Sequence, residues 1–371
     1  MICQKRITEA FCSLTKIDSP SFGERAMTDF LTKRLQELGL TVVEDDAAKK
    51  TNGTAGNLLA TLPGTQEGEP LLFAAHMDTV APALGKKATV HPDGTITSDG
   101  TTVLGADDVS GLSIILEALE SIKEDSLPHR PLEILFTIAE EPYDCGSEVF
   151  DYSKVHAKEA YVLDLSGAVG GAAYAAPTIC SFTFELTGKA AHAGFAPQEG
   201  IHAVAAAALA VSKLKMGKSD EETTLNIGTI QGGTATNIVP DKCVVSGELR
   251  SYSHQTAERV LQNVITVFQN AAKSFGASCR VSSRFGCYAY EISKSHPVVQ
   301  RYAAACRASG VELNLFRTFG GSDANQFARH GISGLVISSA MYRCHSCDEY
   351  TTTKDLQKAA KVTQKLMTAK I

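Results

Sequence analysis

The sequence predicts an α/β protein with a mixed, mainly parallel sheet, into which a smaller ferredoxin-like α+β domain is inserted. Two observations support this fold class. At both ends of the chain, short apolar strands alternate with amphipathic helices, which is the order that builds a parallel sheet. In the middle, the strands instead alternate apolar and polar residues, which is typical of an antiparallel sheet with one face open to water.

Length and composition favour two packed domains and exclude several classes of protein. A chain of 371 residues with 44% apolar side chains is long for one core and has enough apolar residues for two. Its formal charge of −6 leaves no basic excess, so we expect neither nucleic acid nor an anionic membrane as a partner. The longest apolar run, Ala203 to Val211, is far shorter than a bilayer span, and the N-terminus lacks an apolar signal core. We therefore expect a cytoplasmic protein.

The first predicted elements belong to the α/β domain. Ser21-Phe22-Gly23-Glu24 has the form of a capping box, and the helix after it keeps its apolar spacing as far as Gly39, a natural helix stop. The apolar runs that follow predict strands near 41–43, 57–62, 71–75, 132–138 and 160–163, and a helix over about 110–121.

The middle of the chain has the order β-α-β-β-α-β, which is the ferredoxin-like pattern. Its strands are predicted over 180–186, 225–230, 243–249 and 278–284, with helices over about 199–215 and up to Gly276. After Tyr288 the α/β character returns, with a helix after Pro297, a strand near 334–338 and a helix after Thr353. We therefore predict one domain of residues 1–178 and 288–371 and an inserted domain of residues 179–287.

Acidic residues and histidines gather at the ends of the apolar strands. They are His76 and Asp78 after the strand at 71–75, Glu140 and Glu141 after the strand at 132–138, Asp164 after the strand at 160–163, and Asp107 and Asp108 before the helix at 110–121. In an open parallel sheet, these strand ends meet in the crevice where ligands bind. Several carboxylates there would raise one another's pKa values unless cations lay among them.

Each of these motifs also has a structural interpretation. A His-x-Asp motif is often an ordinary hydrogen-bonded pair, Glu140-Glu141 could be a solvated pair, and Asp107-Asp108 could simply begin a helix. The occurrence of four such features at successive strand ends is hard to explain by chance. Two histidines with three or four carboxylates form a ligand set suited to two divalent ions, so the residues favour a two-metal hydrolase.

Five stretches resemble the co-catalytic zinc exopeptidases, a family that includes aminoacylase, carboxypeptidase G and succinyl-diaminopimelate desuccinylase. They are Ala75 to Val80, Leu104 to Asp108, Ala139 to Glu141, Val162 to Asp164 and His345 to Tyr350. The resemblance covers essentially the whole chain and is greatest to the peptidase T-like branch. It implies a metallo-exopeptidase for short peptides, whose inserted domain is a lid through which two subunits form a homodimer.

The resemblance also implies two Zn²⁺ ions per subunit, or other divalent ions such as Co²⁺ or Mn²⁺. Its pattern gives five metal ligands: His76, Asp107 and Asp164 on one ion, and Asp107, Glu141 and His345 on the other. Asp107 would bridge the ions, and Asp78 would orient His76. Glu140 would be the general base that activates the attacking water.

Substrate contacts are implied further along the chain. His192 resembles the lid histidine that helps to bind the oxyanion and reaches the active site of the partner subunit, although the residue alone would suggest a surface loop. Asn237 resembles an asparagine that touches substrate, and Arg250 falls where the family has a carboxylate-binding arginine. Gly321 and Ser322 lie in a stretch that matches a glycine-rich substrate loop.

The predicted activity is removal of the N-terminal residue from tripeptides. Asp164 supports this direction, because the family usually has aspartate here in aminopeptidases and dipeptidases and glutamate in the carboxypeptidase- and acylase-like members. Alternatives within the family are a dipeptidase, a carboxypeptidase and an N-acyl amino acid amidohydrolase. A non-catalytic binding protein on the same scaffold is the alternative of another class, and the presence of Glu140 and of every ligand argues against it.

Overall fold

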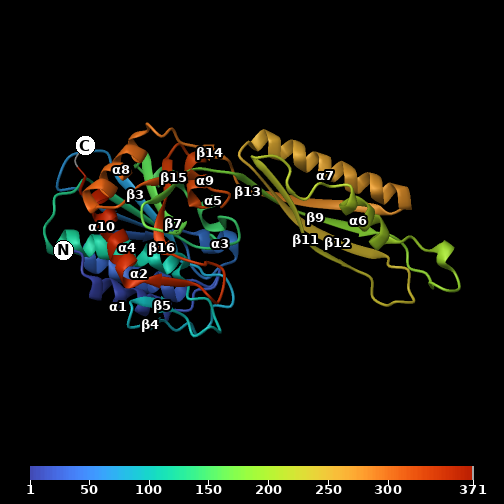
Figure 1. Ribbon diagram of the computed structural model, residues 1–371, viewed down its shortest axis with the longest axis horizontal. Coiled ribbons are helices and arrows are strands. Elements are labelled where there is room, and N and C mark those ends of the chain that lie inside the picture. Colours follow the sequence, from blue (N-terminus) through green and yellow to red (C-terminus); the bar gives the residue numbers. More distant parts are fainter. Residues whose placement is uncertain (370–371) are drawn as a thin grey trace. The chain divides into compact units, whose positions relative to one another are not determined.

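The computed structural model describes residues 1–369, which form two compact units. Unit 1 consists of Met1–Ala175, Glu291–Thr318 and the chain from Ser322 onwards, and unit 2 consists of Ala176–Tyr290 and Phe319–Gly321. The predicted boundaries, after residues 178 and 287, are each three residues from those of the structure, after 175 and 290. The prediction lacks the short return of the chain to unit 2 at Phe319–Gly321. Figure 1 shows unit 2 in the green-to-orange colours of the middle of the chain.

Unit 1 is built on a nine-stranded sheet whose centre is parallel. The central strands are, in spatial order, β6 (Leu132–Thr137), β3 (Leu71–His76), β7 (Glu159–Ser166) and β16 (Ser333–Met341). The flanking strands are β1 (Thr41–Glu44) and β2 (Leu58–Leu62) beside β6, and β8 (Gly171–Ala176), β14 (Tyr290–Glu291) and β15 (Asn314–Arg317) beside β16. β2 and β8 pair antiparallel to the central strands, which confirms the predicted mixed, mainly parallel sheet.

The helices of unit 1 pack on this sheet. They are α1 (Gln4–Thr15), α2 (Arg25–Leu38), α3 (Ala47–Thr51), α4 (Ala106–Glu124), α5 (Cys145–Glu148), α8 (Pro297–Ser309), α9 (Asp323–Arg329) and α10 (Thr353–Met367). α4 contacts β3, β7 and β16, and α1 and α10 pack against α4. The sequence analysis does not predict α1, although Ile7, Phe11 and Leu14 are buried at helical spacing. Within residues 1–369, no helix combines the length and the apolar character needed to span a bilayer.

α2 begins differently from the prediction. Glu24 is its N-cap residue, and no side chain caps the helix, so the predicted capping box is wrong. The Ser21 hydroxyl instead donates to Asp78 Oδ2, and Glu24 Oε1 accepts the N–H groups of Phe22 and Ala139. The local sequence is compatible with a cap, but in the folded chain Ser21 and Glu24 form hydrogen bonds with the distant residues Asp78 and Ala139 instead.

Unit 2 is an antiparallel sheet with two helices. Its strands are, in spatial order, β10 (Gly217–Lys218), β11 (Thr223–Gly232), β12 (Lys242–Ser251), β9 (Thr178–Thr187) and β13 (Ser278–Cys287), and its helices are α6 (Ala203–Ser212) and α7 (His254–Phe275). The chain order β9-α6-β11-β12-α7-β13 confirms the predicted ferredoxin-like pattern. The two-residue edge strand β10 is an addition to it.

The core of unit 2 lies between the two helices and one face of the sheet. β9 buries alternate residues from Cys180 to Leu186, as its sequence pattern predicts. The buried residues of α6 are all alanines, which lets the helix approach the strands closely. α7 buries Phe268, whose ring stacks on that of Phe184 with the centroids 4.0 Å apart. These two rings therefore form a direct apolar contact between α7 and β9.

Replacing Phe268 with alanine should lower the free energy of unfolding of unit 2 by about 3–5 kcal/mol, because a buried ring is lost and a cavity remains. Urea unfolding followed by circular dichroism measures the change. The control, Phe275→Ala, removes a ring that is 38% exposed at the end of the same helix, and should cost less than about 0.5 kcal/mol. Equal losses in the two variants would contradict this account of the core.

Candidate metal centre

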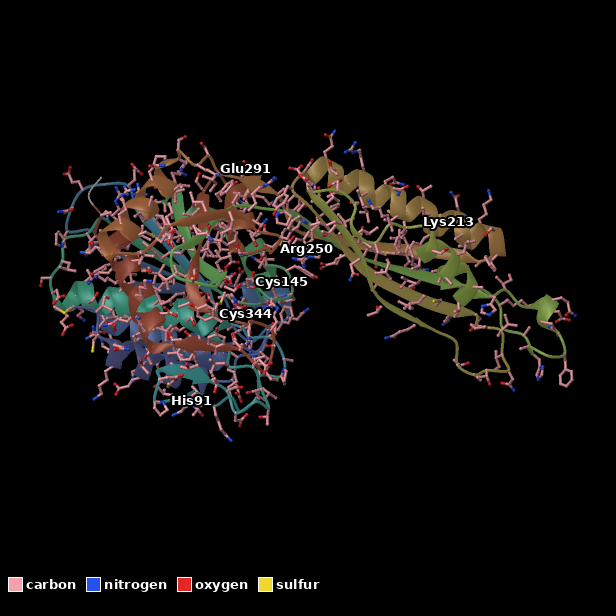
Figure 2. All side chains as sticks on the ribbon, in the orientation of Figure 1. His91, Cys145, Lys213, Arg250, Glu291 and Cys344 are labelled. Atoms are coloured by element: carbon pink, nitrogen blue, oxygen red, sulfur yellow. The ribbon has the colours of Figure 1, made fainter. Side chains whose placement is uncertain are left out.

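The predicted ligands of unit 1 converge at the carboxyl ends of the parallel strands. His76 is the last residue of β3, Asp164 lies near the end of β7, Glu140 and Glu141 follow β6, and His345 lies in the loop after β16. Asp107 comes from the first turn of α4. Figure 2 labels Cys344, which directly precedes His345.

Asp107 lies between the two histidines. His76 Nε2 is 2.9 Å from Asp107 Oδ1, and His345 Nε2 is 3.2 Å from Asp107 Oδ2. Each carboxylate oxygen of Asp107 therefore faces a different histidine, as in a bridging ligand. Each histidine also has a second carboxylate nearby. Asp164 Oδ1 is 3.9 Å from His76 Nε2, and Glu141 Oε2 is 3.2 Å from His345 Nε2.

Two sets of three donor atoms are close enough to hold an ion. Atoms of His76, Asp107 and Glu141 all lie within 4.8 Å of one another, and so do atoms of His76, Glu140 and Asp164. Both sets share His76, and neither is one of the two predicted sets. His345 joins them through its contacts with Asp107 and Glu141, so the five predicted ligands and Glu140 lie in one cluster. His345 is the most exposed of them, with 56% of its side chain accessible, whereas His76 is buried.

The carboxylates of this cluster are unstable as a group of free anions. Burial raises the pKa of Glu140 and of Asp164 well above the usual carboxyl value, and neighbouring carboxylates raise both further. Burial also raises the pKa of Glu141, whose Oε1 is buried without a hydrogen-bond partner. An orphaned carboxylate oxygen among oxygen and imidazole donors fits a divalent cation, so the residues present suit the metal that the sequence predicts.

The surrounding negative charge raises the pKa of both histidines. Hydrogen bonds with Asp107 and Glu141 raise the pKa of His345 to about 10. Burial opposes a charge on His76, but hydrogen bonds with Asp107 and Asp78 raise its pKa well above the usual value. In the metal-free protein, protonated imidazoles therefore supply part of the positive charge that the carboxylates require.

Asp78 connects His76 to the loop that carries Glu140. His76 Nδ1 lies 3.1 Å from the Asp78 carbonyl oxygen and 3.4 Å from its Oδ1, which leaves Nε2 facing Asp107. The two carboxylate oxygens of Asp78 also accept the N–H groups of Glu140 and Glu141, at 2.9 and 3.3 Å. Beyond orienting His76, as predicted, Asp78 therefore fixes the backbone at Glu140 and Glu141.

Two further carboxylates support the cluster and were not assigned a role from the sequence. Asp108 accepts the N–H groups of His76 and Gly111, at 3.2 and 3.0 Å. Glu349 is buried and accepts the N–H groups of Gly105 and Asp107, at 2.6 and 2.8 Å. Burial raises the pKa of Glu349 to about 7. The sequence signal for Glu349 is its position four residues after His345, within a stretch that resembles the family.

Most of the predicted substrate residues lie in unit 2 and are held there by local contacts. His192 Nδ1 accepts the N–H groups of Gly194 and Phe195, both at 3.1 Å, and the Asn237 carbonyl accepts the N–H of Ala193 at 2.9 Å. His192 and Asn237 therefore belong to two loops that pair with each other.

Arg250, which Figure 2 labels on β12, donates to both carboxylate oxygens of Glu248 and to the carbonyl of Phe319. A Cβ at position 321, occupied by Gly321, would lie 2.6 Å from Cys287 Sγ, so close packing against Cys287 favours glycine here. Ser322 belongs to unit 1, where its N–H donates to Asn325 at the start of α9.

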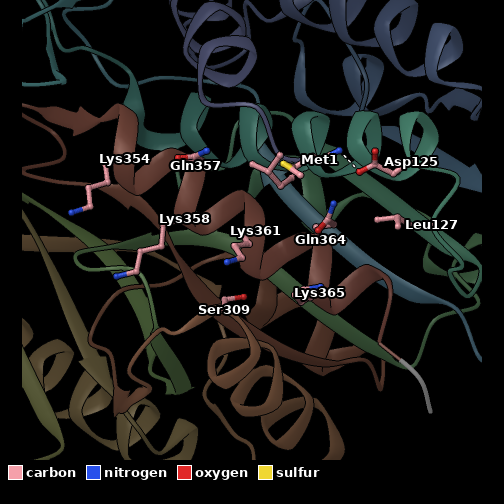
Figure 3. Close-up of a pocket in the computed structure, with 11 residues that line it drawn as sticks. Met1, Asp125, Leu127, Ser309, Lys354, Gln357, Lys358, Lys361, Gln364 and Lys365 are labelled. Carbon is pink, nitrogen blue, oxygen red and sulfur yellow. Dashed lines mark hydrogen bonds and ion pairs between the residues drawn. The ribbon is translucent and has the colours of Figure 1, made fainter.

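A separate hollow of about 620 Å³ follows α10 in unit 1 (Figure 3). Its lining includes four lysines of that helix: Lys354, Lys358, Lys361 and Lys365. None of its lining residues belongs to the cluster around Asp107. The metal site is therefore unrelated to this basic hollow.

Comparisons with known proteins find relatives over both units. Residues 174–275 match the peptidase dimerisation domain of the M20 family. Over 98% of its length and 97% of the relative's, the chain is 36% identical to protein YqjE of Bacillus subtilis (strain 168). It is also similar to a tripeptidase from Staphylococcus aureus, with 34% identity, a TM-score of 0.95 and coverage of 99% and 98% of the two chains.

A second solved structure, aminopeptidase PepT from Bacillus cereus, shares 36% identity at a TM-score of 0.90 and covers the same fractions of both chains. Likeness at this identity extends over both units and includes the dimerisation domain. Together with the histidine and carboxylate cluster around Asp107, it shows that this chain belongs to the M20 metallopeptidase family, in its peptidase T-like branch.

Proposed function

We propose that the protein is a divalent-metal-dependent aminopeptidase that removes the N-terminal residue from tripeptides. The observation that carries this proposal is the cluster in which Asp107 lies between His76 and His345, with Glu141 and Asp164 beside them. The names of its relatives, a tripeptidase and an aminopeptidase, support the same activity and substrate.

We further propose that the cluster holds two Zn²⁺ ions, one on His76, Asp107 and Asp164 and one on Asp107, Glu141 and His345. Two such ions carry +4, and the three carboxylates among these ligands carry −3, so bound metal relieves the surplus of negative charge. When bound, the metal supplies a Lewis acid for the scissile carbonyl and makes the attacking water more acidic.

Glu140 is the proposed general base. Its side chain lies with His76 and Asp164, yet the proposed ligand sets do not need it, so its carboxylate can take the proton of the attacking water. It then gives that proton to the leaving amine. The Asp78 carboxylate holds the Glu140 backbone through a 2.9 Å hydrogen bond, and the Asp78 carbonyl oxygen lies 3.1 Å from His76 Nδ1, so one residue aligns the base with a ligand.

His192 is proposed to donate a hydrogen bond to the developing oxyanion in the partner subunit. Its Nδ1 accepts two backbone N–H groups, so the proton of the neutral ring is on Nε2, which makes Nε2 a donor. Substrate contacts by Asn237, Arg250, Gly321 and Ser322 stay predictions, and so does the cytoplasmic location.

The exposed edge of unit 2 supports a homodimer through this domain. β10 pairs with Leu225 and Thr224 of β11, and the N–H of Ser219 donates to the Thr223 carbonyl, so within the described chain no strand pairs with the outer edge of β11 beyond Leu225. Ile230, which lies in the same strand, β11, is 50% exposed. An unpaired strand edge with an exposed apolar residue is a surface that a second copy can cover, and the matched family domain is one of dimerisation.

Glu140→Gln should abolish turnover while leaving the metal bound. Loss of the proton shuttle should lower kcat by about 10²- to 10⁴-fold. The adjacent control, Glu141→Gln, makes the same chemical change in a proposed ligand and should lower the bound metal as well. Metal content by plasma mass spectrometry, with kcat on a tripeptide, separates the two roles. Near-normal activity of Glu140→Gln at full metal content would show that another residue is the base.

Free tripeptides should lose their N-terminal residue, and N-acetylated tripeptides should react far more slowly, because acetylation removes the ammonium charge and adds bulk at that end. A chelator should stop the release, and Zn²⁺ should restore it. Mass spectrometry of a panel of di- and tripeptides identifies the product. Release of the C-terminal residue from an acetylated tripeptide at the same rate would favour the carboxypeptidase, and cleavage of dipeptides alone would favour the dipeptidase.

Mixed dimers test the contribution of His192 to the partner subunit. His192→Ala and Glu140→Gln subunits should each be inactive alone, but a mixed dimer should recover part of the activity, because one of its two sites has both an intact base and a partner histidine. Differently tagged subunits purified in tandem provide the mixed dimer. A verified mixed dimer without activity would rule out the action of His192 across the dimer.

A further inference from the structure

The loop that carries Glu140 is held by side chains rather than by the sheet. Directly after β6, four successive backbone N–H groups, those of Ile138, Ala139, Glu140 and Glu141, donate to side-chain oxygens. The acceptors are Asn57 Oδ1, Glu24 Oε1, Asp78 Oδ1 and Asp78 Oδ2, at 3.0, 3.0, 2.9 and 3.3 Å. The position of Glu140 therefore depends on side chains from three distant segments of unit 1.

Among these acceptors, Glu24 uses one carboxylate oxygen to accept two backbone N–H groups. Its side chain is fully buried, and its Oε1 accepts the N–H of Ala139 and also that of Phe22, at 2.7 Å. Ala139 and Phe22 both have left-handed backbone conformations, with φ of +45° and +68°. For residues with a side chain such conformations are unfavourable and persist only where the surroundings hold them. One carboxylate oxygen thus holds both strained residues.

The segment around Glu24 also reaches the other acceptor of the loop. The Ser21 hydroxyl donates to Asp78 Oδ2 at 2.7 Å. Ser21–Glu24 therefore contacts Ala139 directly through Glu24, and Glu140 and Glu141 indirectly through Asp78. These contacts use the two side chains that the sequence pattern would have assigned to a helix cap.

We propose that Glu24 is a positioning residue for the general base: by accepting the N–H of Ala139, it sets the backbone conformation from which the Glu140 side chain reaches the cluster. This inference rests on the proposed role of Glu140. Glu24 is fully buried, so its loss should act on the chemical step rather than through a direct contact with substrate. Displacement of a catalytic group by about 1 Å can cost about 100-fold in rate.

Two substitutions of Glu24 distinguish the loss of its charge from the loss of its acceptor oxygen. Glu24→Gln keeps a side-chain oxygen that can accept both N–H groups, and should retain kcat within a few-fold. Glu24→Ala removes the acceptor, and should lower kcat by about 10- to 100-fold with KM nearly unchanged and the bound metal retained. A general loss of stability lowers the folded fraction and therefore the apparent kcat, so kcat is compared per folded enzyme. A loss of kcat per folded enzyme that glutamine rescues is the effect expected of a positioning residue.

Glu117→Ala is a matched control for losing a buried carboxylate. Glu117 accepts hydrogen bonds from the N–H of Cys3 and from the guanidinium of Arg6, and so joins α4 to α1 rather than to the Glu140 loop. This variant should be less stable but should keep the kcat of its folded fraction. Thermal unfolding of each variant sets the temperature at which all are folded for the kinetic comparison.

Amide hydrogen exchange gives a readout that needs no activity. In Glu24→Ala, a peptide covering 138–144 should exchange faster, whereas Glu24→Gln and Glu117→Ala should leave its exchange near that of the parent protein. Unchanged exchange and kcat in Glu24→Ala would overturn the inference, and so would an equal loss of kcat in the glutamine variant. Should the parent protein hydrolyse no peptide, the proposed function fails, and exchange at 138–144 still decides whether Glu24 holds this loop.

Discussion

The constraint on which this structure depends is the packing of four carboxylates and two histidines at one edge of a parallel sheet. Asp107, Glu140, Glu141 and Asp164 cannot all be ionised in a buried cluster without positive charge among them. In the metal-free protein the imidazoles supply some of that charge. Divalent cations would supply more of it, so the arrangement that is unfavourable alone suits bound metal.

The loops that carry these groups are held in unusual conformations. Ala139 precedes Glu140 with a positive φ, and three residues near the end of β16, namely Ala340, Arg343 and His345, also have positive φ. Hydrogen bonds hold these segments: the Thr351 hydroxyl donates to the Ala340 carbonyl, and the Ser346 hydroxyl donates to that of Arg343. Backbone strain is therefore concentrated where the ligands must point inward, and polar contacts offset it.

Unit 2 is stabilised by different means. Its core is apolar, with alanines of α6 and the stacked Phe184 and Phe268 between helices and sheet. His192, Asn237 and Arg250, which are predicted to touch substrate, lie in its loops and at a strand end rather than in that core. A packed core that leaves a strand edge and two loops uncovered is suited to contact other molecules, and the matched dimerisation domain agrees with this.

The sequence by itself indicated the central strands, the chain order of both units and the candidate ligand residues, because periodicity of apolar residues and motifs after strands are local properties. It did not indicate the strands β8, β14 and β15 beside β16. Thus His76, Asp107, Glu140, Glu141, Asp164 and His345 could be named without coordinates. Only the tertiary structure decided which side chains hold them. Ile138 and Ala139 are 81 and 115 residues from their acceptors Asn57 and Glu24, and Asp107 is 242 residues from Glu349. No local pattern records such pairs, so Glu24 was predicted to cap a helix although burial beside the Glu140 loop gave its oxygen another partner.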